Sequence, residues 1–156
     1  MGALPTLYAA TSPDVPGDAF IGPDGIFEDA FLKDAGDDAE GVYCTFGGVP
    51  VSAYTGDAKV FAEKYAKLHG GNPEAYAIYG YEMTKVALAA IAKVNVKDRA
   101  AIRDAIFATK DFKGILGTWS FDANGDTTLT TMSVNEIKRT AEGKLEFELI
   151  EVVSAG

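Results

Sequence analysis

The five residues Val-Tyr-Cys-Thr-Phe at positions 42–46 decide the fold class of this chain, because they predict a strand covered on both faces. β-Branched and aromatic residues favour strands. Near-continuous apolar character, in place of strict alternation, is typical of a strand in a sheet with helices on both sides. Gly47, Gly48 and Pro50 end the strand. The sequence therefore predicts an α/β fold.

Four helices are predicted around this strand. A short helix covers residues 28–33, and longer helices cover residues 57–69, 73–93 and 98–109, where apolar residues recur at helical spacing. The pair Gly70-Gly71 ends the first of the long helices.

The helix at residues 73–93 carries its own start signal. Asn72 is the predicted N-cap, Pro73 takes the first helical position, and Glu74 meets the positive end of the helix dipole. The helix has a stripe of residues spaced by three or four positions, which is predicted to face the core. They are Tyr76, Tyr79, Met83, Val86, Ala90 and Val94.

Further strands are predicted in the last third of the chain. Residues 118–121 and 127–137 form a hairpin about Asn124-Gly125, which is a strong two-residue hairpin signal. Residues 144–153 alternate between apolar and polar side chains, so they predict a half-buried strand.

Composition and charge limit the class of protein. The chain has 156 residues, of which 47% are hydrophobic and 24% charged, as in an ordinary globular domain. Its 23 acids and 14 bases give a net charge of -9, and residues 1–57 hold ten acids and one base. Such a chain repels nucleic acid and disfavours anionic membranes. The acids indicate either a solvated surface or a site for cations and ammonium groups.

Few side chains are suited to metal binding or catalysis. The single Cys44 and single His69 exclude a disulfide framework, a cysteine zinc site and a multi-histidine site within one chain. Residues 122–126 match the start of a calcium loop, but Thr127 and Ser133 stand where such a loop needs Gly and Glu. We expect no metal, no cofactor and no enzymatic activity. A small hydrolase using paired carboxylates remains a rival.

Two residues are candidates for ligand binding. The turn Gly22-Pro23-Asp24-Gly25 places a carboxylate directly after the apolar Phe20-Ile21, where it can meet a ligand ammonium. The alternative is an Asp that bonds its own backbone. Tyr76 lies near the start of a helix, where an aromatic ring can cover the apolar part of a small ligand. The alternative for Tyr76 is packing in the core.

Residues 20–43, 72–91 and 98–134, taken in order, resemble the C-terminal part of type I periplasmic solute-binding proteins of branched-chain amino acid ABC transporters. The resemblance implies a three-layer α/β fragment with a mixed sheet and flanking helices. It further implies capture of a small, branched-chain amino acid and delivery to an ABC permease, with no bond made or broken. The parent protein is then periplasmic or extracellular.

The same resemblance implies roles for individual residues. The acid in the matching turn binds the α-ammonium of the ligand, which is Asp24 here. The aromatic residue at the matching helix start lines the side-chain pocket, which is Tyr76 here. Residues 8–14 are similar to an N-terminal-lobe loop that binds the ligand carboxylate, so Ala9 and Thr11 are further candidates.

Length is the main departure from that family, whose members are more than twice as long. The resemblance implies that residues 20–46 and 144–153 belong to one lobe, and residues 57–140 mainly to the other. We expect a loop-rich segment at residues 1–19 and one α/β domain at residues 20–156. The N-terminus has no basic region and no long apolar region, so no secretory signal is expected.

A fragment of a two-lobed fold leaves apolar faces uncovered. Two outcomes can cover them: a homodimer, or repacking into a smaller α/β fold. A truncated or engineered scaffold with no ligand of its own is the alternative to a binding protein.

Overall fold

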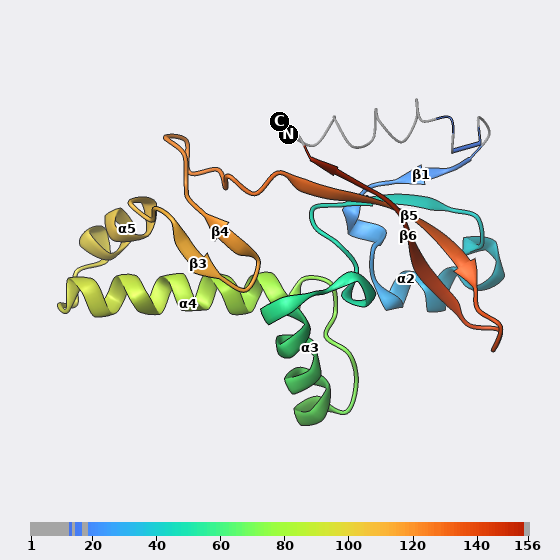
Figure 1. Ribbon diagram of the computed structural model, residues 1–156, viewed down its shortest axis with the longest axis horizontal. Coiled ribbons are helices and arrows are strands. Elements are labelled where there is room, and N and C mark those ends of the chain that lie inside the picture. Colours follow the sequence, from blue (N-terminus) through green and yellow to red (C-terminus); the bar gives the residue numbers. More distant parts are fainter. Residues whose placement is uncertain (1–12, 14, 17–18, 155–156) are drawn as a thin grey trace. The chain divides into compact units, whose positions relative to one another are not determined.

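The computed structural model describes residues 13, 15–16 and 19–154 (Figure 1). Their contacts group into unit 1, Met1–Tyr54 with Thr130–Gly156, and unit 2, Thr55–Leu129. The fold is mixed α/β, with a mixed sheet and flanking helices, as predicted. A single domain at residues 20–156 stays a prediction, and each unit is described by itself below.

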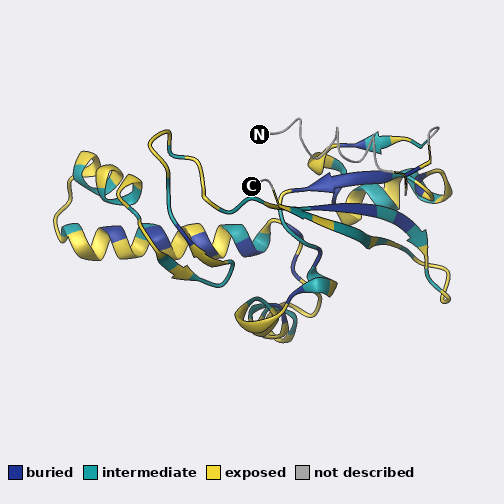
Figure 2. Cartoon of the chain, turned by 45° about the horizontal axis from the view of Figure 1, so that its top comes forward, coloured by how far each residue is buried: buried dark blue, intermediate teal, exposed yellow. Residues whose placement is uncertain are grey.

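Unit 1 contains a four-stranded sheet in the order β1-β2-β5-β6. The strands are β1 (Ile21–Gly22), β2 (Tyr43–Phe46), β5 (Thr131–Arg139) and β6 (Leu145–Ser154). β1 is parallel to β2, and the other two pairs are antiparallel. All four residues of β2 are buried, which confirms the prediction of a strand covered on both faces (Figure 2).

The prediction that residues 127–137 form a hairpin with residues 118–121 was wrong for β5. β5 begins at Thr131 and pairs with β2 and β6, so it belongs to unit 1 and not to the other lobe. At the predicted Asn-Gly hairpin, only a single bridge joins Phe121 to Thr127. The long register with β6 offers β5 far more backbone hydrogen bonds than that short turn could.

Aromatic stacking builds one face of the unit 1 core. Phe27 stacks on Phe46 of β2 at 4.6 Å between ring centroids and contacts Phe147 of β6 at 4.3 Å. It follows the 3₁₀ helix η1 (Asp24–Ile26) and precedes α2 (Asp29–Ala35) and η2 (Gly36–Ala39). Aromatic pairs contribute about 0.5–1.5 kcal/mol beyond their buried area. These contacts therefore attach the short helices to the sheet.

The opposite face of the sheet has a second cluster. Tyr43, Val134 and Val15 are buried together there, with Ile21 and Ile150 packed against them. A strand with apolar partners on both faces needs cover on both sides, and the two clusters supply it.

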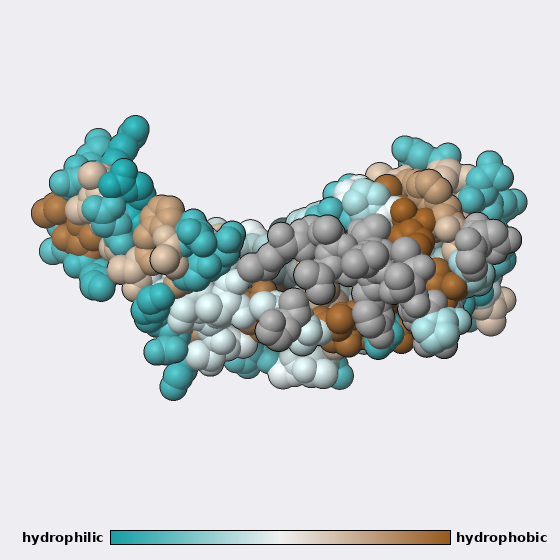
Figure 3. All heavy atoms as spheres, turned by 90° about the horizontal axis from the view of Figure 1, so that it is seen from above, coloured by the Kyte–Doolittle hydropathy of each residue, from teal (hydrophilic) through white to brown (hydrophobic). Residues whose placement is uncertain are grey.

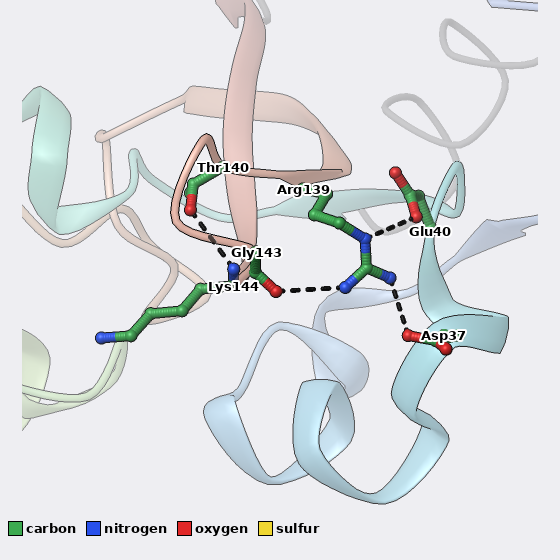
Figure 4. Close-up of polar contacts among 6 residues, drawn as sticks. All are labelled: Asp37, Glu40, Arg139, Thr140, Gly143 and Lys144. Carbon is green, nitrogen blue, oxygen red and sulfur yellow. Dashed lines mark hydrogen bonds and ion pairs between the residues drawn. The ribbon is translucent and has the colours of Figure 1, made fainter.

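A polar cluster fastens the end of β5 to the segment after α2 (Figure 4). The Arg139 guanidinium donates through Nη2 to Asp37 Oδ1 at 2.7 Å and through Nε to Glu40 Oε2 at 3.1 Å. Its Nη1 donates to the carbonyl of Gly143, in the turn that joins β5 to β6, at 3.1 Å. One side chain thus connects three backbone segments.

We predict that Arg139→Ala lowers the urea midpoint of unfolding in low-salt buffer, because the variant releases η2 and the β5–β6 turn together. The loss should shrink in 1 M NaCl, since salt screens exposed ion pairs. The matched control is Arg103→Ala, which removes an exposed pair between sequence neighbours, Arg103 and Asp104. Equal losses from both variants would contradict a linking role for Arg139.

Unit 2 contains three helices and a two-stranded sheet. The helices are α3 (Gly56–His69), α4 (Ala77–Val94) and α5 (Arg99–Phe107), and β3 (Phe112–Gly114) pairs antiparallel with β4 (Gly117–Trp119). α3 ends at Gly70 with a left-handed φ of 78°, as the paired glycines predict. Asp98 caps α5, accepting from the N–H groups of Ala100 and Ala101. No helix among the described residues is long and apolar enough to span a bilayer.

The start and the buried stripe of α4 differ from the prediction. The helix begins at Ala77, and the residues from Asn72 lead into it through a turn in which Ala77 N–H donates to Glu74 O. The buried residues of the helix are Ile78, Glu82, Val86 and Ala90. Val86 and Ala90 belong to the predicted stripe, whereas Ile78 and Glu82 each lie one position before a predicted residue.

Glu82 is the polar centre of unit 2. Its carboxylate is fully buried and accepts hydrogen bonds from Trp119 Nε1 at 3.0 Å and from the N–H of Ile115 at 3.1 Å. Gly114 lies so close that a Cβ there would overlap this carboxylate. The turn between β3 and β4 is therefore held against α4 by hydrogen bonds to one side chain.

We predict that Glu82→Ala destabilises the chain by about 2–3 kcal/mol, because buried N–H donors lose their acceptor. Gly114→Ala should also destabilise, since its methyl group displaces the Glu82 carboxylate. Urea titration followed by circular dichroism and Trp119 fluorescence measures both effects. The exposed Glu63→Ala on α3 is the control, and a Glu82→Ala midpoint equal to that control would contradict the assignment.

Candidate functional site

The candidate site lies where two parallel strands end. β1 and β2 pair in parallel, with Ile21 opposite Tyr43 and Gly22 opposite Cys44, so the chain leaves both strands at the same edge of the sheet. Asp24 follows β1 by two residues, and Gly47 follows β2. In α/β sheets, ligands bind outside the carboxyl ends of parallel strands. The predicted turn therefore lies at a position suited to ligand binding.

The turn that carries Asp24 is held by its own backbone and by the core. Ile26 N–H donates to Pro23 O at 3.2 Å, and Phe27 N–H donates to Asp24 O at 2.9 Å. A Cβ at Gly22 would overlap the end of the Ile26 side chain, so a larger residue at this position would displace that side chain. With Phe27 stacked in the core, Asp24 is presented at the surface of unit 1 on an ordered turn.

The charge of unit 1 favours a positively charged group at this edge. Residues 1–54 and 130–156 hold 14 acids and four bases. The excess creates a negative potential that attracts cations and ammonium groups and repels anions. An anionic ligand without an ammonium group is disfavoured there for the same reason.

Tyr76 lies in unit 2, immediately before α4, and 40% of its surface is exposed. Its carbonyl accepts the N–H groups of Tyr79 and Gly80, each at 3.2 Å. Tyr76 therefore lies at the N-terminal end of the helix and is not fully buried, and its role in ligand binding stays a prediction. Ala9 and Thr11 lie outside the described residues.

The acids at residues 122–126 form a turn. Asp122 Oδ1 accepts the N–H groups of Asn124 at 2.8 Å and Asp126 at 2.9 Å. The Asp126 and then the Asn124 hydrogen bonds hold the pKa of Asp122 below its usual range. The described part of the chain contains no group of three or more acidic, histidine or cysteine ligands that could hold a metal.

His69 is the last residue of α3, and its ring lies 4.4 Å from that of Tyr65, one helical turn earlier. It is exposed at the end of the helix.

Residues 3–144 match the family model described as periplasmic binding protein. The chain belongs to the periplasmic binding protein family. Leu/Ile/Val-binding protein homolog 1 of Brucella abortus (strain 2308) is 32% identical over 130 residues, which are 82% of this chain and 34% of that relative. The chain therefore spans about a third of the length of the curated relatives that it matches.

Two solved structures of periplasmic binding proteins resemble the chain. The leucine binding protein LivK from Thermotoga maritima has a TM-score of 0.71 and 30% identity, covering 86% of this chain and 37% of its own. The branched-chain amino acid transporter substrate binding protein LivJ from Streptococcus pneumoniae, in complex with isoleucine, has a TM-score of 0.69 and 26% identity. It covers 85% of this chain and 37% of its own.

Cys44 lies in β2 beside the candidate edge, but it is not a reactive group. It is fully buried, and burial raises the pKa of its thiol from 9.0 to about 12. Tyr54, the last residue of the first segment of unit 1, is also buried, and burial raises its pKa from 10.0 to about 12. Both groups stay protonated in the folded chain at neutral pH.

The Cys44 thiol makes the free energy of unfolding depend on pH in the alkaline range. The unfolded thiol ionises near pH 9 and the folded thiol near pH 12, so the folded state holds the proton that the unfolded state loses. Stability is complete below pH 9 and falls as pH rises from 9 towards 12. We predict that the wild-type chain loses about 1.4 kcal/mol more than Cys44→Ala between pH 8 and pH 10.

Urea unfolding at a series of pH values measures this difference. The comparison with Cys44→Ala cancels the titration of groups that both chains share, Tyr54 included. Parallel curves for the two chains would show that the thiol reaches solvent in the folded state.

Proposed function

We propose that this chain binds a small, branched-chain amino acid, as part of a periplasmic or extracellular solute-binding protein that serves an ABC importer. The observation that carries the proposal is the exposed Asp24 carboxylate on an ordered turn at the carboxyl edge of β1 and β2. Membership of the periplasmic binding protein family and relatives named for leucine, isoleucine and valine support it. Catalysis has no part in this function.

Asp24 accepts hydrogen bonds from the α-ammonium of the ligand in this proposal. A charge-assisted hydrogen bond between an ammonium and a carboxylate is about twice as strong as a neutral one. The excess of acids in unit 1 adds to the attraction and accelerates encounter with a cationic group. The ligand is accordingly a zwitterion and not a simple carboxylate.

Tyr76 covers the apolar side chain of the ligand, and Ala9 and Thr11 donate to its carboxylate. The exposed ring at the start of α4 supports the first of these roles. Closure of the family fold around the ligand is a shift in population towards the state that binds better. A membrane permease is the partner that receives the amino acid.

The second candidate is a scaffold that keeps part of the fold and binds nothing. One observation favours it: the chain matches only about a third of the length of its relatives. Ligand binding by the isolated chain separates the two candidates.

We predict that leucine, isoleucine or valine at 100 times its Kd stabilises the chain by about 2.7 kcal/mol, measured as a thermal shift and by calorimetric titration. Asp24→Asn should weaken binding by roughly ten-fold or more, because it removes the charge that pairs with the ammonium. 4-Methylpentanoate, which is leucine without its ammonium group, should not bind the wild-type chain.

The exposed Asp34→Asn in α2 is the matched control and should bind as the wild type does. Retained affinity in Asp24→Asn would reassign the ammonium partner. A chain that folds and responds to none of the three amino acids would favour the scaffold.

A further inference from the structure

The turn at residues 122–126 has no role in the proposed function. It lies between β4 and β5, where the chain rises as an orange loop clear of the helices and strands of unit 2 (Figure 1). Figure 3 looks at the side to which this loop rises, and hydrophilic residues make up much of the surface of unit 2 there. Within the turn, Asn124 is exposed and Gly125 follows it. An asparagine side chain can close a five-membered ring with the next backbone nitrogen, and the next residue decides how easily it does so.

Glycine at position 125 is required by the conformation and by the packing of the turn. Its φ is 87°, in the left-handed region that favours glycine. A Cβ there would lie 2.6 Å from Cε1 of Phe107, the last residue of α5. The turn therefore keeps beside Asn124 the residue type that leaves its backbone nitrogen uncrowded.

We propose that Asn124 is a site of spontaneous deamidation. The backbone nitrogen of Gly125 loses its proton to water or hydroxide and attacks Cγ of Asn124. The new N–Cγ bond closes a succinimide ring, and the Cγ–Nδ2 bond breaks as the amide nitrogen takes up a proton and leaves as ammonia. Water then adds to one of the two ring carbonyls, and the ring opens to aspartate or isoaspartate. Water is the only co-reactant, and the modification adds a negative charge to the turn.

The turn holds the reacting nitrogen weakly. Gly125 N–H donates to Asp122 O at 3.3 Å, which is longer than the usual distance of about 2.9–3.0 Å. The strand pairing beside the turn is a single bridge from Phe121 to Thr127. An exposed turn with so little pairing opens locally at a low cost in free energy. Such opening brings the Gly125 nitrogen to Cγ of Asn124.

The Asp122 carboxylate slows the reaction. Its Oδ1 accepts the N–H of Asn124 at 2.8 Å and the N–H of Asp126 at 2.9 Å, so it fixes the backbone on both sides of the reacting nitrogen. Ring closure requires rotation about the bond between Cα and the carbonyl carbon of Asn124, which these hydrogen bonds resist. The negative charge of Asp122 also disfavours loss of a proton from a neighbouring N–H group. The rate of modification therefore depends on this one side chain.

The other three asparagines of the chain are protected by their neighbours or by burial. Pro73 follows Asn72, and its nitrogen carries no proton to lose. Val96 follows Asn95, and its β-branched side chain crowds the backbone nitrogen. Asn135 is fully buried in β5, which pairs with a strand on each side. The chain thus contains its own controls for the reaction at Asn124.

Deamidation changes the turn in two ways. Each event adds one negative charge to a chain whose net charge is -9. In the isoaspartate product, the backbone runs through the former side chain, so one extra carbon separates positions 124 and 125. Gly125 is then displaced from its place against the Phe107 ring, and the turn loses its contact with the end of α5.

Peptide mapping by mass spectrometry tests the proposal. After the folded wild-type chain is kept at physiological pH and temperature, the peptide containing Asn124 should gain about 1 Da and contain isoaspartate. Its rate should exceed that of each other asparagine at least about ten-fold, because glycine leaves the nitrogen uncrowded. The rate should also rise with pH above neutrality. Asn124→Ser lacks the reacting amide and should keep a single peak on anion exchange.

The same measurement on the chain unfolded in urea shows what the folded turn contributes. A folded chain that keeps its Asn124 amide while the unfolded chain loses it would overturn the proposal, because the turn would then block the reaction. Faster deamidation at any other asparagine of the folded chain would overturn it as well.

Two variants test the role of Asp122. Asp122→Ala should deamidate several-fold faster than the wild type, because it frees the N–H groups of Asn124 and Asp126. Asp122→Ser removes the charge but keeps an oxygen that can accept in such a turn, so it should react more slowly than Asp122→Ala. Equal rates in the two variants would assign the effect to charge alone and overturn the role of the hydrogen bonds. Circular dichroism checks that each variant keeps its fold.

Discussion

The contact of Phe27 with Phe46 and Phe147 is the interaction on which unit 1 depends. It joins the short helices to two strands of the sheet that are distant in sequence. It also determines where Asp24 lies, since Phe27 closes the turn by donating its N–H to the Asp24 carbonyl. The core and the candidate site are therefore linked, because the buried Phe27 ring holds the turn that carries the exposed Asp24.

In unit 2, a polar contact joins a helix to the small sheet. Glu82 binds the β3–β4 turn and the Trp119 indole, and Gly114 leaves room for its carboxylate. Burying a charged group is costly unless its hydrogen bonds are made. Unit 2 meets that requirement by placing several N–H donors around one acceptor, so a helix and a small sheet are aligned without a large hydrophobic core.

Local signals in the sequence predicted local structure well. The strand at β2, the end of α3 before Gly70 and the start of α5 next to residue 98 all depend on residues within one turn or one strand. The partners of β5 were predicted wrongly because they depend on contacts with distant segments. No sequence pattern singled out Glu82, although a lone acid within an apolar helix is a signal of a buried hydrogen-bonded group. The position of Asp24 on a turn after a strand could be predicted, whereas its support by Phe27 could not.

The pairing of β2 with β5 has a consequence for how the chain folds. These neighbours in the sheet are separated in the sequence by the whole of unit 2, so their contact order is high. During synthesis, β2 leaves the ribosome long before its antiparallel partner exists, while the helices of unit 2 can form from nearby residues. The entropy of closing this loop grows only slowly with its length. Unit 2 can therefore vary in size between proteins without greatly changing the stability of the sheet whose strands precede and follow it in the sequence.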